Sequence, residues 1–201
     1  VRTDTNHFEI FPWNENFETG HTTIDEQHKV LAKLLNNLAG TLVDTDEAKT
    51  DQALSELADY ANFHFEEEEA IWSESFGKDS WFSTHQMNHA SFLPQVVALK
   101  NLRSDVSMVN VVEQTIKFLI RWLALHIIDS DKRMAIAIEA LQSGSTMKEA
   151  KILADRKMSG TVRPLIEALL KMYDELSSRT LDLIREENAR KQAQLKIQTI
   201  E

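Results

Sequence analysis

The sequence predicts an all-α protein: an up-down antiparallel four-helix bundle (residues 21–140) with an N-terminal arm (1–20) and a C-terminal helical extension (141–201). Three observations favour this fold. Only five glycines and three prolines occur among the 201 residues, so few positions disfavour helix. Apolar residues recur at three- and four-residue spacing in four successive stretches, which is the period of one helical face. Short polar segments join these stretches, and short connections make neighbouring helices antiparallel.

The arm contains several aromatic residues but has no helical period. We therefore expect it to lie extended, with its aromatic side chains packed on the core. His7 and His21 fall in this region and are interpreted as loop histidines. The first helix is expected to begin at Thr23, because Thr23 and Glu26 have the spacing of a capping box.

Boundaries of the next three helices are also visible in the sequence. Polar residues 44–47 form a loop and the start of a second helix that runs to roughly Ser75, and residues 77–80 break the pattern. Pro94 lies inside the third helix and lacks an amide hydrogen, so we expect a kink or a break there. A turn at residues 103–105 precedes the fourth helix, and helical composition continues from it through Gly144.

The extension is interrupted at residues 159–161, and Pro164 suits the first turn of a new helix. Beyond the interruption, alternating three- and four-residue spacing is typical of a coiled-coil seam. The residues of this seam are Val162, Ile166, Leu169, Tyr173, Leu176, Thr180, Leu183 and Ile197. The seam predicts a homodimer joined through the tail, with an output domain following it. The alternative is a helix that packs back on the bundle.

Composition excludes several classes of function. With no cysteine, the chain has no disulfide, zinc–thiolate or iron–sulfur site. The net charge of −10 opposes binding to nucleic acid and to anionic membranes. No apolar run is long enough to span a bilayer, and the first residues do not resemble a signal peptide. We therefore expect a cytoplasmic protein.

Each predicted helix carries metal-ligand side chains on its apolar face. In chain order they are His28, His64, Glu68, His85, His89 and His126, followed by Asp129 or Asp131. One such histidine is also typical of an ordinary core, but four helices that all carry them favour a metal site. Seven ligands exceed what one zinc ion binds, which indicates two metal ions. Imidazole and carboxylate ligands without thiolate favour iron, with manganese or zinc as alternatives.

Helical phase leaves the last ligand open. A residue three positions after His126 lies on nearly the same face of an α-helix, which favours Asp129. Asp131, five positions after His126, lies away from that face. From phase alone, Asp129 is the better candidate.

The pattern of these residues resembles the bacterial hemerythrins over residues 10–137. It consists of Trp13, Gly20, Ile24-Asp25-Glu26-Gln27-His28, His64-Phe65-x-x-Glu68, His85-x-x-x-His89 and Trp122-Leu123-x-x-His126-x-x-x-x-Asp131. The resemblance selects Asp131 over Asp129, and Phe65, Trp122, Leu123 and Ile127 match the family's apolar dioxygen pocket.

This resemblance implies two non-haem iron ions joined by an oxo or hydroxo bridge. His28 and His64 would hold one iron and the other three histidines the second, while Glu68 and Asp131 would bridge them. One coordination position would stay open on the iron with two histidines. Hemerythrins bind dioxygen at such a position.

The runs at residues 172–177 and 185–187 resemble the connecting helix of bacterial proteins in which a hemerythrin domain precedes a diguanylate cyclase. This second resemblance implies a dioxygen or redox sensor. It would not itself be an enzyme, and it would control an output domain, here one that makes cyclic di-GMP. A chemoreceptor-type output is an alternative. Two other functions remain as alternatives, namely a dioxygen carrier or store and a di-iron oxidase or peroxidase.

Overall fold

The computed structural model describes residues 9–44, 46–101 and 108–159 continuously. It also describes part of the tail, namely residues 171–172, 175, 178–180, 182–183, 185–187, 189–191 and 193–194. His7, the turn at 103–105, Pro164 and most of the predicted coiled-coil seam lie outside the described residues.

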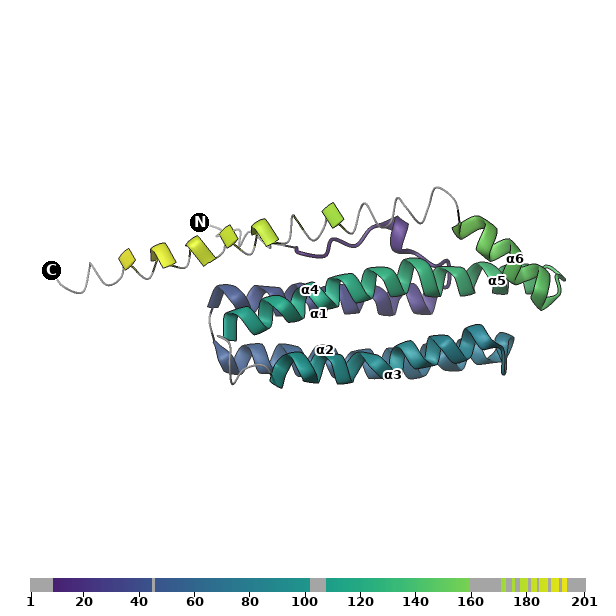
Figure 1. Ribbon diagram of the computed structural model, residues 1–201, viewed down its shortest axis with the longest axis horizontal. Helices are drawn as coiled ribbons and strands as arrows, with labels where there is room; N and C mark the ends of the chain where they lie inside the picture. The colour runs from purple at the N-terminus through teal and green to yellow at the C-terminus, as the bar shows by residue number, and fades with distance from the viewer. Residues whose placement is uncertain are drawn as a thin grey trace.

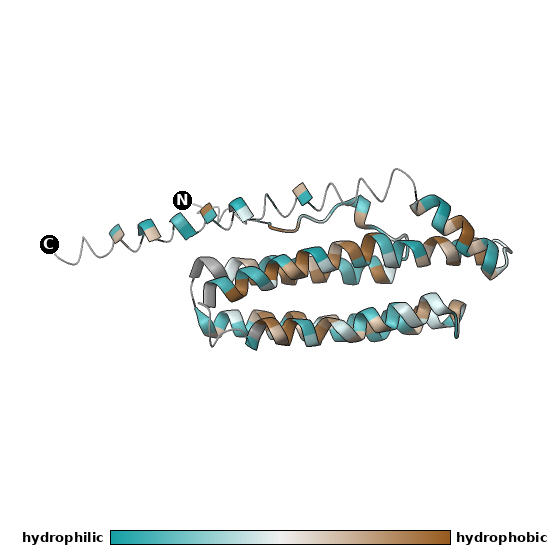
Figure 2. Ribbon diagram, viewed as in Figure 1, coloured by the Kyte–Doolittle hydropathy of each residue, from teal (hydrophilic) through white to brown (hydrophobic). Residues whose placement is uncertain are grey.

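Four long helices form an antiparallel up-down bundle, which confirms the predicted all-α fold (Figure 1). They are α1 (Thr22–Asp44), α2 (Glu47–Phe76), α3 (Ser80–Asn101) and α4 (Met108–Leu125). Helix α1 packs on α2 and α4, and α3 packs on the same two helices. Hydrophobic and hydrophilic residues alternate along each helix in Figure 2, as expected of helices with one buried face.

Helix α1 begins differently from the prediction. It starts at Thr22, so Thr23 lies inside the helix and the predicted capping box is wrong. Its first turn is organised by the buried carboxylate of Asp25, which accepts hydrogen bonds from the backbone and hydroxyl of Thr19 (2.7 and 2.8 Å) and from the backbone of Gly20 (3.1 Å). Gly20 has a φ of 93°, a conformation that glycine adopts without strain.

Helix α3 is continuous through Pro94, so the predicted break does not occur. Proline removes one hydrogen bond at this position. The buried side chains of Phe92 and Val96 on either side keep the helix packed against its neighbours. Both α3 histidines precede Pro94 by at least one turn, so the proline does not affect their spacing.

Residues 9–21 form the described part of the arm, with one turn of 3-10 helix, η1 (Glu15–Phe17). Phe11 is buried and exchanges two hydrogen bonds with the side chain of Asn36. The Phe11 amide donates to Asn36 Oδ1 (2.8 Å), and Asn36 Nδ2 donates to the Phe11 carbonyl (3.0 Å). Trp13 packs on the rings of Phe17 and His28, at centroid distances of 5.5 and 6.1 Å. The expectation that the arm lays its aromatics on the core therefore holds for these residues.

The sequence predicts helical composition through Gly144, but in the structure the helix ends at Gln142. A π-helical segment, η3 (His126–Asp131), follows α4 and leads into α5 (Lys132–Gln142). Gly144 then adopts a φ of 92°, and the backbone amides of Gly144 and Ser145 bond back to Leu141 and Ala140, as in a Schellman motif. Thr146 and Glu149 form a capping box that begins α6 (Met147–Met158).

A layer of histidines and carboxylates separates two apolar clusters in the bundle. One cluster contains the arm and most of the buried residues of α1, α2 and α4. The other lies around Trp72 and Phe76 and includes α5 and α6, whose Ala137, Ala150 and Ala154 are fully buried. Helix α6, within the predicted extension, therefore completes the core at this end.

The described tail residues run back along the bundle (Figure 1). The Arg185 side chain pairs with Glu113 on α4 and donates to Asn110 Oδ1 (2.8 Å). This contact corresponds to the alternative in which the tail packs on the bundle. Among the described residues, no helix is both long and apolar enough to cross a membrane.

Replacing Asn36 with alanine should loosen the arm. The variant leaves the buried amide and carbonyl of Phe11 without partners, and we expect a loss of about 1–3 kcal/mol in the free energy of unfolding. Urea denaturation followed by tryptophan fluorescence measures this loss. The matched control is Asn37→Ala at the neighbouring exposed position. Equal stabilities of the two variants would contradict the assigned role of Asn36.

Candidate metal centre

The structure brings all seven predicted ligands together in the polar layer of the bundle. Every one of them is buried, and His28, Glu68 and Asp131 have no exposed surface. Helix α1 supplies one ligand, α2 and α3 supply two each, and the π-helical segment supplies two. The full set is His28, His64, Glu68, His85, His89, His126 and Asp131.

The π-helical segment explains why Asp131 and not Asp129 joins the site. Its turns close through hydrogen bonds between residues five apart, such as the Lys132 amide to the Ile127 carbonyl. This wider turn places Asp131 on the same face as His126, and an oxygen of its carboxylate lies 3.3 Å from His126 Nε2. Asp129 points away from the site and pairs with Arg133 at 2.5 Å. The phase argument for Asp129 is therefore wrong.

The ligands form two groups that share one carboxylate. Glu68 lies with His85, His89 and His126 in one group, and with His28 and His64 in the other. Oxygen Oε2 of Glu68 is 3.1 Å from His85 Nε2, 3.3 Å from His89 Nε2 and 3.9 Å from His64 Nε2. This is the division into a three-histidine and a two-histidine position that the resemblance implies.

The carboxylate of Asp131 also lies close to histidines of both groups. Its Oδ2 lies 3.4 Å from His28 Nε2, in the two-histidine group. Its Oδ1 lies near His126 and 3.7 Å from His85 Nδ1, in the three-histidine group. Both carboxylates are therefore placed where they could bridge two metal ions.

Several buried polar atoms in this layer have no hydrogen-bond partner. They are both ring nitrogens of His28, His64 Nε2, Glu68 Oε1 and both carboxylate oxygens of Asp131. Leaving such atoms unpaired in an apolar core costs free energy, which a bound cation would offset. The donor set, five imidazoles and two carboxylates, fits a pair of iron ions.

Burial sets the charge state of the site. Desolvation lowers the pKa of His28, lowers that of His64 to about 3, and lowers that of His126 well below its usual value. These rings are therefore neutral near pH 7, the form that binds metals. Burial alone would raise the pKa of Glu68, but hydrogen bonds from His126 and His85 hold it well below its usual value. Burial and the nearby Glu68 charge raise the pKa of Asp131.

Three residues that the sequence analysis did not assign hold the outer nitrogens of the ligands. His64 Nδ1 lies 2.8 Å from Gln27 Oε1, His85 Nδ1 lies 2.9 Å from Ser130 Oγ, and His89 Nδ1 lies 2.9 Å from Glu69 Oε1. Such partners fix the orientation and tautomer of metal-binding histidines. Each is adjacent in sequence to a predicted ligand, which is the signal that could have identified it.

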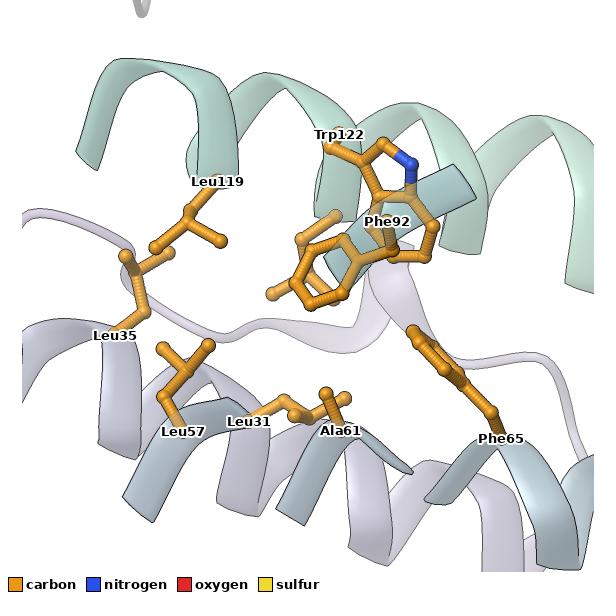
Figure 3. Close-up of a pocket in the computed structure, with 9 residues that line it drawn as sticks. Leu31, Leu35, Leu57, Ala61, Phe65, Phe92, Leu119 and Trp122 are labelled. Carbon is orange, nitrogen blue, oxygen red and sulfur yellow. The ribbon is translucent and has the colours of Figure 1, made fainter. Parts of the chain in front are cut away.

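An apolar cavity of about 20 Å³ lies in the core (Figure 3). Two of its wall residues, Phe65 and Trp122, stack on His89 and His126. Roughly 10–15 Å³ on this measure holds one water molecule, so the cavity has room for one small molecule. Three of the four predicted pocket residues line it: Phe65, Trp122 and Leu123. The fourth, Ile127, is fully buried in the adjoining core but does not line the cavity. The remaining walls are Leu31, Leu35, Leu57, Ala61, Phe92 and Leu119.

The cavity follows from helical spacing. Leu31 lies one turn after His28 on α1, and Ala61 lies one turn before His64 on α2. Both ligands of the two-histidine group therefore adjoin the cavity through their nearest neighbours on the same face. Phe65 closes the side toward the three-histidine group, where its ring stacks on His89 at 3.9 Å.

Without metal, the protein should lose stability in acid. Unfolded, His64 titrates near its ordinary pKa of 6.5, whereas burial lowers its pKa to about 3 in the folded state. Below pH 6.5 the unfolded chain therefore binds more protons, and the free energy of unfolding falls by up to about 1.4 kcal/mol per pH unit for this residue. His28 and His126 act in the same direction, and Asp131 opposes them.

Urea denaturation of chelator-treated protein at about pH 7.5 and about pH 5 measures this dependence. The slope should shrink in His64→Gln, which removes the titrating ring. Equal midpoints of denaturation at the two pH values would contradict the assignment of neutral, buried imidazoles.

Comparison with known proteins agrees with this geometry. The family described as the hemerythrin HHE cation binding domain matches residues 19–137. A bacteriohemerythrin of Clostridium acetobutylicum is 29% identical over 127 residues, which are 61% of this chain and 97% of that protein. A hemerythrin-like protein of Naegleria gruberi is 31% identical and a myohemerythrin of Theromyzon tessulatum 29% identical, each over 123 residues, 61% of this chain and 89% of the relative. The chain therefore belongs to the hemerythrin HHE cation-binding domain family.

Proposed function

We propose that this chain binds dioxygen at a non-haem di-iron centre and signals the result through its C-terminal helices. One observation carries the proposal: two histidine groups share Glu68, and an apolar cavity with room for one small molecule is lined by Phe65, whose ring stacks on His89. His28 and His64 would hold one iron, and His85, His89 and His126 the other, with Glu68 and Asp131 between them. Diferrous iron supplies the electrons and the open coordination position that reversible dioxygen binding requires.

The side chains around the site prepare it for this chemistry. Gln27 Oε1 accepts a hydrogen bond from the Nδ1–H of His64. The lone pair of His64 therefore lies on Nε2, which faces Glu68. Leucine, alanine and aromatic side chains line the cavity and exclude water from it. Exclusion of water and protons slows irreversible oxidation of a ferrous centre.

Sensing is favoured over carriage by the chain beyond the bundle. The bacterial and protist relatives are matched over most of their own length by only 61% of this chain. A path of direct contacts also leads out of the site. Ser130 holds His85, the adjacent Asp129 pairs with Arg133, and Arg133 also pairs with Asp155 on α6 at 2.8 Å. A change at the π-helical segment would therefore reach α6.

The proposed output is a diguanylate cyclase, on the resemblance of the tail to the connecting helices of such proteins. A homodimer through the tail and a cytoplasmic location belong to the same proposal, in which the module itself is not an enzyme. The apolar lining of the cavity also favours a second candidate function, a dioxygen carrier or store.

An anaerobic optical titration distinguishes these functions. The iron-loaded protein is reduced, dioxygen is admitted, and the ligand-to-metal absorption is followed over time. We expect two irons per chain and an oxygenated spectrum that decays quickly to a diferric one, which is the behaviour of a sensor that responds through oxidation. A long-lived, reversible adduct would favour carriage, and sustained oxidation of added substrate would favour an oxidase. Absence of an iron-dependent spectrum would overturn the proposal.

Arg133→Met should uncouple α6 from the site. The variant keeps the length of the side chain but removes both ion pairs, and because these pairs are partly exposed we expect the stability to change by less than about 1 kcal/mol. Iron content should be unchanged. In the wild type, we expect the hydrogen-exchange rates of α6 to differ between reduced and oxidised protein. In Arg133→Met, most of this difference should disappear.

The control for this experiment is Arg156→Met, which removes an exposed arginine from α6 itself. If Arg133→Met retained the full difference in exchange, the coupling would not run through Arg133.

A further inference from the structure

The three outer partners of the histidines differ in charge. His64 bonds to the neutral amide of Gln27 and His85 to the neutral hydroxyl of Ser130, whereas His89 bonds to the carboxylate of Glu69. Among the described residues, Glu69 is thus the one carboxylate within hydrogen-bond distance of an outer histidine nitrogen, since the Asp131 carboxylate lies 3.7 Å from His85 Nδ1. Glu69 contacts a histidine of the three-histidine group. The two metal positions therefore differ in the negative charge near them as well as in the number of their histidines.

Both oxygens of Glu69 are held. Oε1 accepts from His89 Nδ1 at 2.9 Å, and Oε2 accepts from Gln86 Nε2 at 2.9 Å. Gln86 and His89 both come from α3, so the carboxylate of α2 is fixed across the interface between the two helices. Its side chain is 26% exposed and lines a groove of about 600 Å³ between α2 and α3. The carboxylate of Glu69 is therefore partly exposed to solvent, while the imidazole that it contacts is buried.

This hydrogen bond determines the tautomer of His89. A carboxylate only accepts, so Nδ1 carries the proton and the lone pair lies on Nε2. Nε2 points to the centre of the three-histidine group, 3.3 Å from Glu68 Oε2 and 2.7 Å from His126 Nε2. The ring of Phe65, stacked on His89 at an interplanar angle of 14°, prevents the imidazole from turning.

A negative charge behind an imidazole makes its opposite nitrogen a stronger donor to a metal. It also stabilises Fe(III) more than Fe(II), because the attraction grows with the charge of the ion. Because His89 is buried, its interaction with Glu69 is screened less than that of an exposed pair.

We propose that Glu69 is a positioning residue that, through His89, lowers the reduction potential of the iron in the three-histidine group. This inference rests on the proposed di-iron function. The affected step is Fe(III) + e⁻ → Fe(II), in which no bond to the protein forms or breaks. Glu69 would thereby favour oxidation of the centre, as a sensor that responds through oxidation requires.

The test compares Glu69→Gln with the wild type by spectroelectrochemical titration of the iron-loaded protein. The glutamine retains an oxygen that can accept from His89 but lacks the charge. We expect the ratio of oxidised to reduced iron at a fixed potential to fall about tenfold, which for a one-electron couple is an increase of about 59 mV in the midpoint. Iron content should be unchanged.

Three further variants distinguish the effect of the Glu69 charge from that of its hydrogen bond. Glu66→Gln removes an exposed carboxylate one turn away on the same helix and should leave the potential unchanged. Glu69→Ala removes the hydrogen bond as well and should also weaken iron binding, by roughly 10- to 100-fold. Glu69→Asp, which restores the charge, should restore part of the wild-type potential.

The outcomes distinguish this inference from the function on which it rests. Wild-type protein that binds two irons, together with a Glu69→Gln variant of unchanged potential, would overturn the role of the Glu69 charge and leave the di-iron function intact. An equal shift in Glu66→Gln would likewise overturn a specific role for Glu69. A wild-type chain that binds no iron would overturn both.

Discussion

The bundle depends on holding seven ionisable side chains between two apolar clusters. Removing imidazoles and carboxylates from water is unfavourable by several kcal/mol per charged group unless each finds a partner. The protein provides part of the compensation itself, through Gln27, Ser130 and Glu69. Several atoms at the centre, among them both oxygens of Asp131, have no hydrogen-bond partner within the described residues. Protein packing therefore specifies the places of the ligands, and a bound cation would satisfy these atoms.

The same constraint accounts for motif residues that are not ligands. Asp25 fixes the turn at Gly20 and so sets where α1 begins, which determines the height at which His28 enters the core. Trp13 covers His28 from the arm, and Asn36 holds the arm in place through Phe11. The arm and the first turn of α1 thus help to fix the position of His28 in the two-histidine group.

Helical periodicity was enough to predict the bundle and the convergence of the histidines, because both depend on residues that share one α-helical face. It failed where the backbone departs from that period. Asp131 reaches the site only through a π-helical turn, which no local propensity of residues 126–131 indicates. Gly144 and the Thr146–Glu149 capping box did carry a local signal for the end of α5 and the start of α6. The hydrogen bond between Glu69 and His89 joins α2 to α3, and a contact between distant segments is not determined by sequence spacing alone.

The π-helical segment links the chemistry of the site to the fold beyond it. The wider π-helical turn brings Asp131 toward the site. It also sets the rotation of α5 about the helix axis relative to α4. If this segment reverted to an α-helix, α5 would turn by about 100° and move by about 1.5 Å relative to α4, which are the values for one residue of α-helix. Bridging two metal ions through Asp131 favours the π form, because Asp129 takes its place on the α-helical face. In the proposed sensor, a change in ligation at Asp131 would therefore alter the relative stability of two discrete helix registers, and α6 would follow through Arg133 and Asp155.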